Sequence, residues 1–438
     1  MHMRKSEFSF KAEFAVTVIL LIFAACSKND NPEPSPVITS FYPTFGLVGS
    51  SVAIYGDQFI PTVPPEKGVG PFTNTSIVAF NGTVAEAEYV YQDSIGKQHI
   101  YPTKVPAGAT SGKITVTANG KTVSSLDDFI VCVPIYLPNV EVSSVPASGA
   151  WGRDAAVDSE GSLYVTHTDP DNRIVRITPD GNAHTLWTPS VWGETPMGIV
   201  VDANKNVFAT IYSSYILKIS ADGKATILAG SAESGDVDGQ GASARFNLSF
   251  GIAVDNDGNV YVADTFNHKI RKISPDGIVS TLAGSTSGYK DGAGTNAQFE
   301  GPMDVATDGE GNVYVSDGFR IRKITSDGQV STVAGSTPGY LDGTTANARF
   351  GQLVGIAIDT AGNLYVCDVD NTYLRYLVVR RIASDGTVVT VAGSTSGHLD
   401  GPGSVAKFDR ITGISMISNG TFYIAQSDDG PIRKIVVH

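Results

Sequence analysis

The sequence GIAVDNDGNVYVADTFNHKIRKISPDGIVSTLAGS, residues 251–285, decides the fold because the chain repeats it. Close copies begin at residues 198, 304 and 355, and more divergent copies begin at residues 154 and 413. The matching aspartates, 44 to 53 residues apart, are Asp158, Asp202, Asp255, Asp308 and Asp359. A period of this size is typical of the blades of a β-propeller.

Each copy contains four short apolar or alternating runs, which predict four β-strands. In residues 251–285 the runs are GIAVD, NVYV, IRKI and VSTLAG, and D-x-x-G-N and P-D-G turns separate them. Six copies predict six blades, but the last copy has only three strands. The segment 140–145, VEVSSV, is similar to a fourth strand. We therefore expect it to close the ring of a propeller that spans residues 138–438.

The spacing of GIAVD, GNVYVAD and NHKIRKI resembles that of NHL repeats. This resemblance extends from residue 138 to the C-terminus and implies a six-bladed NHL-type propeller. Related propellers include binding scaffolds as well as lactonases and a lyase. Because one fold serves all of these functions, the resemblance does not by itself decide what the chain does.

Residues 37–133 predict a second all-β module, because short alternating strands are separated by glycine turns such as Asn81-Gly82. The stretches PVITSFYPTFGLVGSSVAIYGDQF (36–59) and SGKITVTANGKTVSSLDDFIV (111–131) resemble IPT/TIG immunoglobulin-like domains. The resemblance implies a spacer or interaction module, and residues 61–75 are an insertion relative to it. The predicted fold class is all-β: an immunoglobulin-like sandwich followed by a six-bladed propeller.

The N-terminus predicts secretion and lipid anchoring. Basic residues precede a short apolar run, and the run ends Phe-Ala-Ala-Cys26, which resembles a bacterial lipobox. We expect a signal peptide over 1–25, a lipid on Cys26 and an extended tether over 26–36. The tether resembles those of surface lipoproteins in Bacteroidetes-like bacteria. The expected location is the outer membrane, facing either the cell surface or the periplasm.

Composition argues against two classes of site. The formal net charge is −13, and no Lys/Arg-rich run appears, so nucleic acid is not an expected partner. The three cysteines form no CxxC or Cys/His cluster, which argues against a structural zinc site. The sequence predicts no cofactor, although Ca²⁺ would suit a group of carboxylate oxygens.

Because neighbouring strands are antiparallel, the start of the first strand and the end of the second strand of each copy lie on the same face of the propeller. There we also expect the long loops at 235–246, 288–299, 339–350 and 397–408. The strand ends supply His167, Asp264, Asp317, Asp368 and Gln426, and Asp154 and Asp304 stand where other copies have glycine. The five aspartates are candidates for a cation or polar-ligand site. The alternative for Asp264, Asp317 and Asp368 is that each caps its own turn.

Aromatic and imidazole side chains suggest a second kind of site on that face. Tyr289, Tyr340 and His398 hold equivalent loop positions, and Trp151 and Trp192 flank the first copy. Such rings could stack on sugars, or they could pack against the neighbouring blade.

Three functions remain open from the sequence. The first is an envelope scaffold, not an enzyme, that binds a glycan or a protein. The second is a metal-dependent hydrolase or lyase like the lactonase propellers, which would need Asp154 and Asp304 to converge on one ion with the strand-end carboxylates. The third is a structural spacer.

Overall fold

The structure is a computed structural model. It describes residues 35–438, apart from positions 49, 60–71, 74–75, 87–88, 93–96, 119, 148–149, 169–171, 192, 213, 371–375 and 419. The expected signal peptide, Cys26, most of the tether and Trp192 lie outside the described residues. The described part consists of β-strands and the short 3-10 helices η1 (Gly241–Ser243), η2 (Thr265–Asn267) and η3 (Gly294–Asn296). Within it, no helix is long and apolar enough to cross a bilayer.

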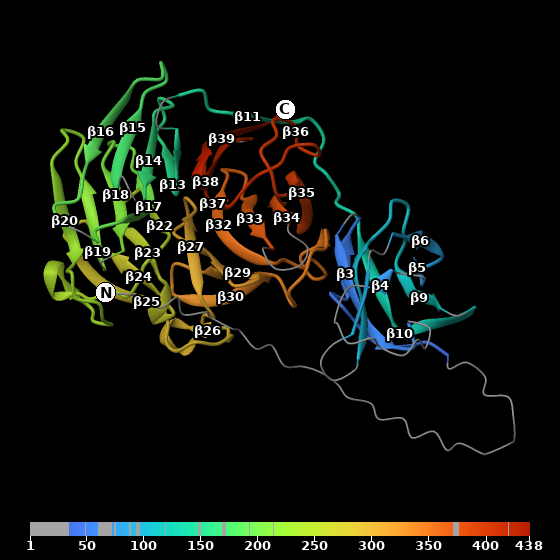
Figure 1. Cartoon of the computed structure of the whole chain (residues 1–438). Coiled ribbons are helices and arrows are strands. Elements are labelled where there is room, and N and C mark those ends of the chain that lie inside the picture. The colour runs from blue at the N-terminus through green and yellow to red at the C-terminus, as the bar shows by residue number, and fades with distance from the viewer. Residues whose placement is uncertain are drawn as a thin grey trace, which may run out of the picture. The chain divides into compact units, whose positions relative to one another are not determined.

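Two five-stranded sheets share one apolar core in the first module (Figure 1). One has the order β1 (Val37–Tyr42), β3 (Ser51–Asp57), β8 (Gln98–Lys104), β7 (Tyr89–Gln92) and β4 (Phe72–Thr73). The other has the order β2 (Phe45–Leu47), β10 (Lys121–Cys132), β9 (Gly112–Ala118), β5 (Ile77–Phe80) and β6 (Thr83–Ala85). Alternate residues face the core, as Val52 and Ile54 do in β3. Asn81 and Gly82 form the turn between β5 and β6 with φ angles of 42° and 86°.

Six further sheets follow, and we name each by its innermost strand. The β13 sheet comprises β13 (Asp154–Val157), β14 (Leu163–His167), β15 (Arg173–Ile177) and β16 (Ala183–Trp187). The β17 sheet comprises β17 (Pro196–Val201), β18 (Val207–Ile211), β19 (Tyr215–Ile219) and β20 (Ala225–Gly230). The β22 sheet comprises β22 (Ile252–Val254), β23 (Val260–Asp264), β24 (Lys269–Ile273), β25 (Ile278–Gly284) and β21 (Gly239–Gln240).

The remaining three sheets have the same plan. The β27 sheet comprises β27 (Pro302–Thr307), β28 (Val313–Asp317), β29 (Arg320–Ile324), β30 (Gln329–Ala334) and β26 (Gly292–Ala293). The β32 sheet comprises β32 (Gln352–Ile358), β33 (Leu364–Val369), β34 (Tyr376–Ile382), β35 (Thr387–Thr395) and β31 (Gly343–Thr344). The β37 sheet comprises β37 (Ile411–Ser418), β38 (Thr421–Pro431), β39 (Arg433–Val437), β11 (Val140–Ser144), β36 (Gly401–Pro402) and β12 (Trp151–Gly152).

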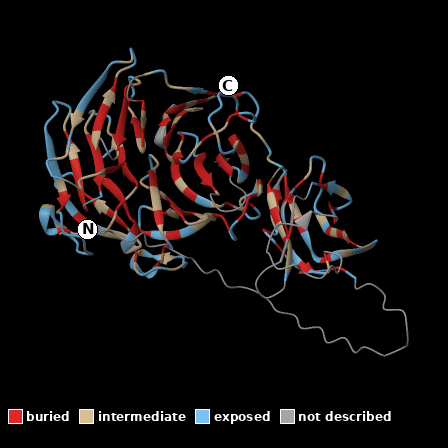
Figure 2. Ribbon diagram, viewed as in Figure 1, coloured by how far each residue is buried: buried red, intermediate tan, exposed pale blue. Residues whose placement is uncertain are grey.

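The innermost strands stand in a closed ring around a central channel. β13 contacts β17, and the contacts continue through β22, β27, β32 and β37 back to β13. The face at which these strands begin is called the mouth face, and the second strand of each sheet ends there. The opposite face carries the D-x-x-G-N and P-D-G turns and is called the hairpin face. In Figure 2 burial is concentrated on the strands, while many of the turns are exposed.

The β37 sheet is assembled from two distant segments. β11 pairs antiparallel with β39, from Val140 opposite Val437 to Ser144 opposite Arg433. The backbone N–H of His438 also donates to the carbonyl of Asn139 at 2.9 Å. Val140 and Val142 are buried in the core of this sheet. The last sheet of the ring therefore gains its fourth antiparallel strand from a segment that precedes the first sheet.

The long loops follow a different path from the one expected. They do not stay on the mouth face but run down the outer edge of the next sheet. In the first of them, Gly239 pairs with Val279 at the start of β25, and Gly241 donates its N–H to Gly277 in the P-D-G turn. The loop then returns to Phe246, which is fully buried. These loops therefore cover the edge of the outermost strand, which would otherwise expose unpaired backbone groups.

Candidate functional site

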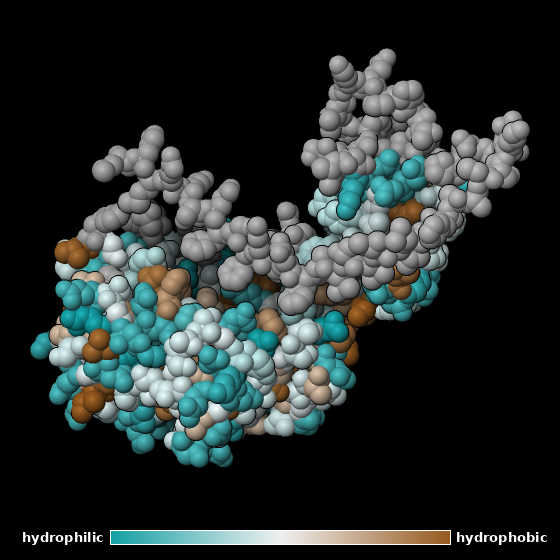
Figure 3. Space-filling view, turned by 90° about the horizontal axis from the view of Figure 1, so that it is seen from below, coloured by the Kyte–Doolittle hydropathy of each residue, from teal (hydrophilic) through white to brown (hydrophobic). Residues whose placement is uncertain are grey.

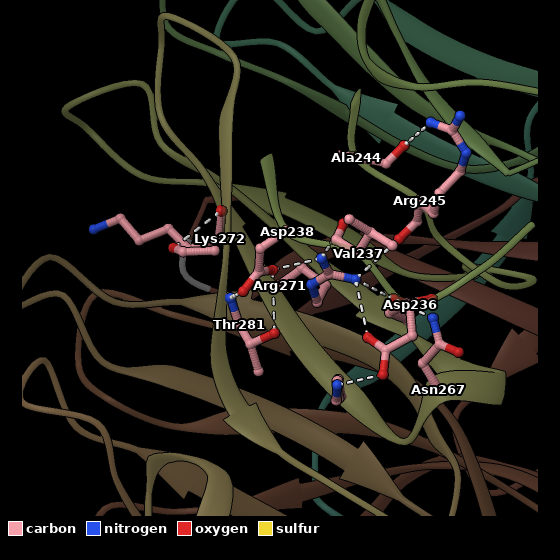
Figure 4. A network of polar contacts seen from close by, with 12 residues as sticks. Asp236, Val237, Asp238, Ala244, Arg245, Asn267, Arg271, Lys272 and Thr281 are labelled. Atoms are coloured by element: carbon pink, nitrogen blue, oxygen red, sulfur yellow. Dashed lines mark hydrogen bonds and ion pairs between the residues drawn. The ribbon is translucent and has the colours of Figure 1, made fainter. Parts of the chain in front are cut away.

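A buried arginine on the third strand fastens each of these loops to its sheet. Arg271, on β24, is fully buried, and its Nη1 donates to Asp264 Oδ2 at 2.8 Å and to the carbonyl of Arg245 at 3.1 Å. Its Nη2 donates to the carbonyl of Val237 at 2.9 Å and to Asp238 Oδ1 at 2.5 Å. Figure 4 shows the guanidinium of Arg271 among Val237, Asp238 and Arg245. The fork geometry of the guanidinium allows it to bind two carboxylates and two carbonyls together.

The arrangement recurs in three further sheets. The equivalent arginines are Arg322, Arg380 and Arg433, and their carboxylate partners in the loops are Asp291, Asp342 and Asp400. At the end of the second strand, Asp317 and Asp368 bind the first two of these arginines, at 3.0 and 2.8 Å. In the β37 sheet that place is taken by Gln426, whose Oε1 accepts the N–H of Asp409. The β13 and β17 sheets have Val175 and Leu217 at the arginine position.

Three of the candidate cation ligands therefore have a structural role. Asp264, Asp317 and Asp368 are fully buried, and each is paired with the arginine of its own sheet. Their second oxygens accept backbone N–H groups where the loop rejoins the sheet, as Asp264 Oδ1 does from Asn247 at 2.8 Å. They are not brought together with Asp154 and Asp304. Among the described residues, no group of three or more His, Cys, Asp or Glu side chains is placed to hold a metal ion.

Asp154 and Asp304 do reach the central channel. Asp154 begins β13, and its Oδ1 and Oδ2 accept the N–H groups of Ala155 at 2.9 Å and Ile199 at 3.0 Å. Asp304 lies in β27 and binds Val305 at 2.8 Å and Ile356 at 2.9 Å in the same way. One bond in each pair is made to the innermost strand of the next sheet. The two carboxyl groups therefore hold neighbouring sheets together.

Each of these carboxyl groups also faces a glycine of the preceding sheet. A Cβ added to Gly413 would lie 1.9 Å from Asp154 Oδ1, and one added to Gly251 would lie 2.1 Å from Asp304 Oδ1. Such distances are far inside van der Waals contact. An aspartate at the start of one innermost strand therefore requires glycine at the equivalent position of the strand before it.

The two aspartates separate two parts of the channel. A cavity of about 30 Å³ opens toward the mouth face beside Arg153, Met197 and Phe250. A second cavity, of about 200 Å³, extends toward the hairpin face between the innermost strands. Asp154 and Asp304 line both. The smaller cavity has room for little more than a water molecule, so the channel is constricted at these residues.

Burial changes the proton affinity of both groups. Desolvation raises the pKa of Asp154 to about 7, and the neighbouring Arg153 partly opposes this shift. Desolvation also raises the pKa of Asp304 well above its usual range, and the charge of Asp154 adds to that effect. Both carboxyl groups therefore resist carrying a negative charge together in the channel.

Two of the predicted ligand-binding side chains are inaccessible. His167 is fully buried, with the ring of Trp151 4.1 Å away between centroids. Tyr340 is 1% exposed, packs edge-on against Tyr376 at 4.9 Å and hydrogen-bonds Thr390. The interpretation of His167 and Tyr340 as ligand-binding residues is therefore wrong, because both side chains are used for packing between strands.

Tyr289 and His398 remain at the surface. Tyr289 is 49% exposed and lies on the guanidinium of Arg320, 3.8 Å from its ring centroid. Phe319 lies on the same guanidinium at 4.0 Å. The Nε2 of His398 lies 3.5 Å from Asp409 Oδ2 in an exposed loop. Trp151 is half-buried, and its ring packs against His167.

Further aromatic residues on the mouth face escaped the sequence analysis. Tyr212, Phe266 and Phe319 occupy the connection between the second and third strands of three consecutive sheets. Tyr212 is 47% exposed and Phe266 is 54% exposed. We call these three residues, together with Tyr289 and Arg320, the aromatic arc. In the view of Figure 3, exposed hydrophobic residues form small separate patches among hydrophilic ones. An alignment of the copies could have revealed Tyr212, Phe266 and Phe319, because each follows the end of the second strand by one or two residues.

Sequence comparisons support the architecture of the propeller. Residues 286–437 match the family described as the teneurin NHL domain, and residues 251–273 match the NHL repeat. Human Teneurin-4 is 26% identical over 333 residues, which cover 63% of this chain and 12% of the relative. The Arabidopsis thaliana protein SUPPRESSOR OF QUENCHING 1, chloroplastic, is 40% identical over 85 residues, 19% of this chain and 8% of the relative. The chain thus matches only about a tenth of the length of these curated relatives.

Solved structures show likeness over nearly the whole chain. A Bacteroides thetaiotaomicron protein of unknown function has a TM-score of 0.53 and 21% identity, and the match covers 93% of this chain and 99% of that one. An auxiliary nutrient binding protein from the same organism has a TM-score of 0.51 and 16% identity, with coverage of 92% and 98%. At these identities the likeness concerns the fold. The chain is therefore an all-β protein whose C-terminal part is similar to NHL-type propellers.

Proposed function

We propose that this chain is a lipid-anchored bacterial envelope protein that binds a partner on the mouth face of its propeller. In this proposal residues 1–25 are a signal peptide, Cys26 carries the lipid, and residues 26–36 form a tether. Residues 37–133 are an IPT/TIG-type immunoglobulin-like spacer. The six sheets over residues 138–438 are the blades of an NHL-type propeller.

The aromatic arc carries the binding proposal. Two neighbouring sheets present exposed rings, Tyr212 and Phe266. In the next sheet Arg320 is enclosed between Tyr289 and the half-buried Phe319 and pairs with Glu300 at 3.2 Å. Aromatic and arginine side chains supply much of the binding free energy in protein interfaces, and aromatic rings also stack on sugars. The sheets that bear Phe266 and Phe319 have the buried arginines that hold their outer loops. The arc therefore rests on a rigid support, which lowers the entropy lost on binding.

The comparison with solved structures fits this proposal. One structural neighbour, matched over 92% of this chain, is described as an auxiliary nutrient binding protein. The partner that we propose is a protein or a glycan of the envelope. A structural spacer is the competing hypothesis, and it requires no binding at the arc.

The binding proposal can be tested with the immobilised protein and envelope extracts of the producing bacterium. We expect wild-type protein to retain a protein or a glycan, and a Tyr212→Ala/Phe266→Ala variant to retain at least tenfold less. The matched control is Ile278→Ala, which removes an equally exposed apolar side chain, 51% exposed, from the hairpin face. Equal retention by both variants and the wild type would favour the spacer. Protease digestion of the extract distinguishes a protein partner from a glycan.

The proposed anchor has an independent test. Cells that express the wild type and a Cys26→Ala variant are supplied with a labelled fatty acid. We expect label on the wild-type protein alone, because the thiol of Cys26 is the proposed attachment point. Equal labelling of both proteins would contradict the anchor and leave the binding test untouched.

A further inference from the structure

The hairpin face has a groove of about 900 Å³ between the β27 and β32 sheets. The hairpins at 307–310 and 358–362 form its inner end, and the turn at 382–386 forms its outer side. Its volume lies in the range typical of small-molecule binding sites. It lies on the opposite face of the ring from the aromatic arc.

The repeat explains why the groove opens at this position. In the β22 sheet, a Cβ on the turn residue Gly277 would lie 2.9 Å from the carbonyl of Leu228 in the preceding sheet. In the β27 sheet, a Cβ on the equivalent Gly328 would lie 3.9 Å from the carbonyl of Leu282. In the β32 sheet, a Cβ on Gly386 would meet no atom of the preceding sheet within 4 Å. The separation of neighbouring sheets therefore grows along this series.

Two substitutions within the repeat accompany the opening. Val333 stands where the two preceding sheets have Leu228 and Leu282, so a methylene group is missing from the wall. Ile358 stands where the β27 sheet has Thr307, whose hydroxyl donates to the carbonyl of Val254 at 3.2 Å and ties two innermost strands together. An isoleucine cannot make this bond. The β32 sheet therefore lacks the hydrogen bond that links the β22 and β27 sheets.

The groove combines an apolar floor with polar groups at its rim. Tyr314, Val333 and Ile358 are half-buried and pack on the core below. The rim carries the Glu310 carboxylate and the hydroxyls of Thr345 and Ser384. None of these three polar groups makes a side-chain hydrogen bond to a residue that the structure describes. They are therefore free to bind a ligand.

Charge restricts the kind of ligand. Three carboxylates, of Asp308, Glu310 and Asp359, line the groove together with one cation, Lys323. The ammonium group of Lys323 lies over the ring of Tyr314, 5.4 Å from its centroid. The negative excess repels phosphates and acidic sugars. The groove therefore suits a ligand without negative charge that offers an apolar face to the floor and hydroxyls to the rim.

We propose that this groove binds a neutral oligosaccharide. A sugar ring lies with its C–H face on Tyr314, Val333 and Ile358. Its hydroxyls donate to the carboxylate of Glu310 and exchange hydrogen bonds with Thr345 and Ser384. Saccharides meet all three requirements, because each ring has an apolar face and a rim of hydroxyl groups.

The test uses the whole chain and titrates it with defined oligosaccharides. The probes are cellohexaose, xylohexaose and mannohexaose, with the galacturonic acid hexamer as the anionic counterpart. We expect at least one neutral probe to bind, the anionic one to bind more weakly, and Glu310→Gln to weaken binding of the neutral probe about tenfold. The matched control is Asp257→Asn, which makes the same change at the equivalent position of the closed β22 hairpin. Absence of binding by all three neutral probes would overturn the proposal.

A second variant tests the shape of the groove. Val333→Leu/Ile358→Thr restores the residue types of the neighbouring, closed interface, so we expect it to fold normally and to lose the neutral probe. Equal binding by this variant and the wild type would overturn the assignment to the groove. The result is independent of the mouth face, because Tyr212→Ala/Phe266→Ala should bind the probe like the wild type.

Discussion

At the scale of single residues, the buried arginines show why the repeats keep an arginine where a lysine would not serve. Each binds carboxylates and backbone carbonyls that diverge from one point, as Arg322 does with Asp317, Asp291 and the carbonyl of Lys290. The planar guanidinium meets these acceptors in a fixed geometry, whereas an ammonium group could not reach them all. The outer loop is thereby joined to the sheet without an unpaired buried charge.

We predict that Arg322→Ala destabilises the chain far more than Arg433→Ala. Loss of Arg322 leaves the carboxylate of Asp317 fully buried and unpaired, which should cost about 3–5 kcal/mol. Loss of Arg433 leaves only the half-exposed Asp400 without its cation, because the strand-end position in that sheet holds the neutral Gln426. Urea denaturation of both variants measures the difference. Equal losses would contradict the view that the buried carboxylate determines the cost.

The residue-scale pairings were only partly visible in the sequence. Asp154 and Asp304 stood out because they interrupt the repeat, and both lie in the channel. Their bonds to Ile199 and Ile356 could not be inferred, because these come from neighbouring sheets. For the aspartates at strand ends the sequence left a ligand role and a turn-capping role open, because it did not reveal their arginine partner.

At the scale of elements, residue size on one innermost strand matches residue size on the innermost strand of the neighbouring sheet. Asp154 replaces a glycine in β13 and occupies space that only Gly413 of β37 leaves free. The same exchange links Asp304 of β27 with Gly251, which precedes β22. The identity of one strand's first residues is therefore determined by the neighbouring sheet.

A double-mutant cycle tests this fit. We predict that Gly413→Ala strongly lowers the thermal unfolding temperature of the wild type, because the new Cβ overlaps Asp154 Oδ1. In an Asp154→Gly background, Gly413→Ala should lower the unfolding temperature only slightly. The nearest remaining atom of residue 154 is then its Cα, 3.4 Å from the new Cβ.

The Gly251 position provides the contrast. Its Cβ would also lie 2.4 Å from the Cα of Asp304 and 2.8 Å from the carbonyl of Met303. Asp304→Gly should therefore not rescue Gly251→Ala. Rescue at both positions, or at neither, would contradict the geometry.

The elements themselves were largely predictable, and the path of the loops was not. Alternating apolar residues and turn motifs mark each strand, because local hydrogen bonding and burial determine them. In the first long loop, Gly239 lies beside β25 because Arg271 holds Val237 and Asp238 there. That contact joins residues far apart in the sequence, and no local pattern encodes it.

At the scale of the whole molecule, the ring depends on one pairing between distant segments. Val140 and Val437 are direct partners in adjacent strands, and the N–H of Val437 bonds to Gly420 on the far side. They therefore form a pair without mutual hydrogen bonds, in which the side chains approach closely. We predict that Val140→Cys/Val437→Cys forms a disulfide that stabilises the chain by about 3–5 kcal/mol.

The measurement is guanidinium denaturation with and without a reductant. The expected gain appears only in the oxidised protein, and single-cysteine variants serve as controls. The buried Cys132 and Cys367 should not compete, because neither thiol is accessible. A double variant that stays reduced under oxidising conditions would contradict the pairing of β11 with β39.

This pairing also has a consequence for biosynthesis. β11 is translated before any of the six sheets has formed, yet its partner β39 emerges from the ribosome only after the other five have been made. Until then, β11 has an unpaired edge and the nascent ring stays open. If the chain is exported as proposed, this step follows translocation. Periplasmic chaperones that shield strand edges would then influence its yield more than its final stability.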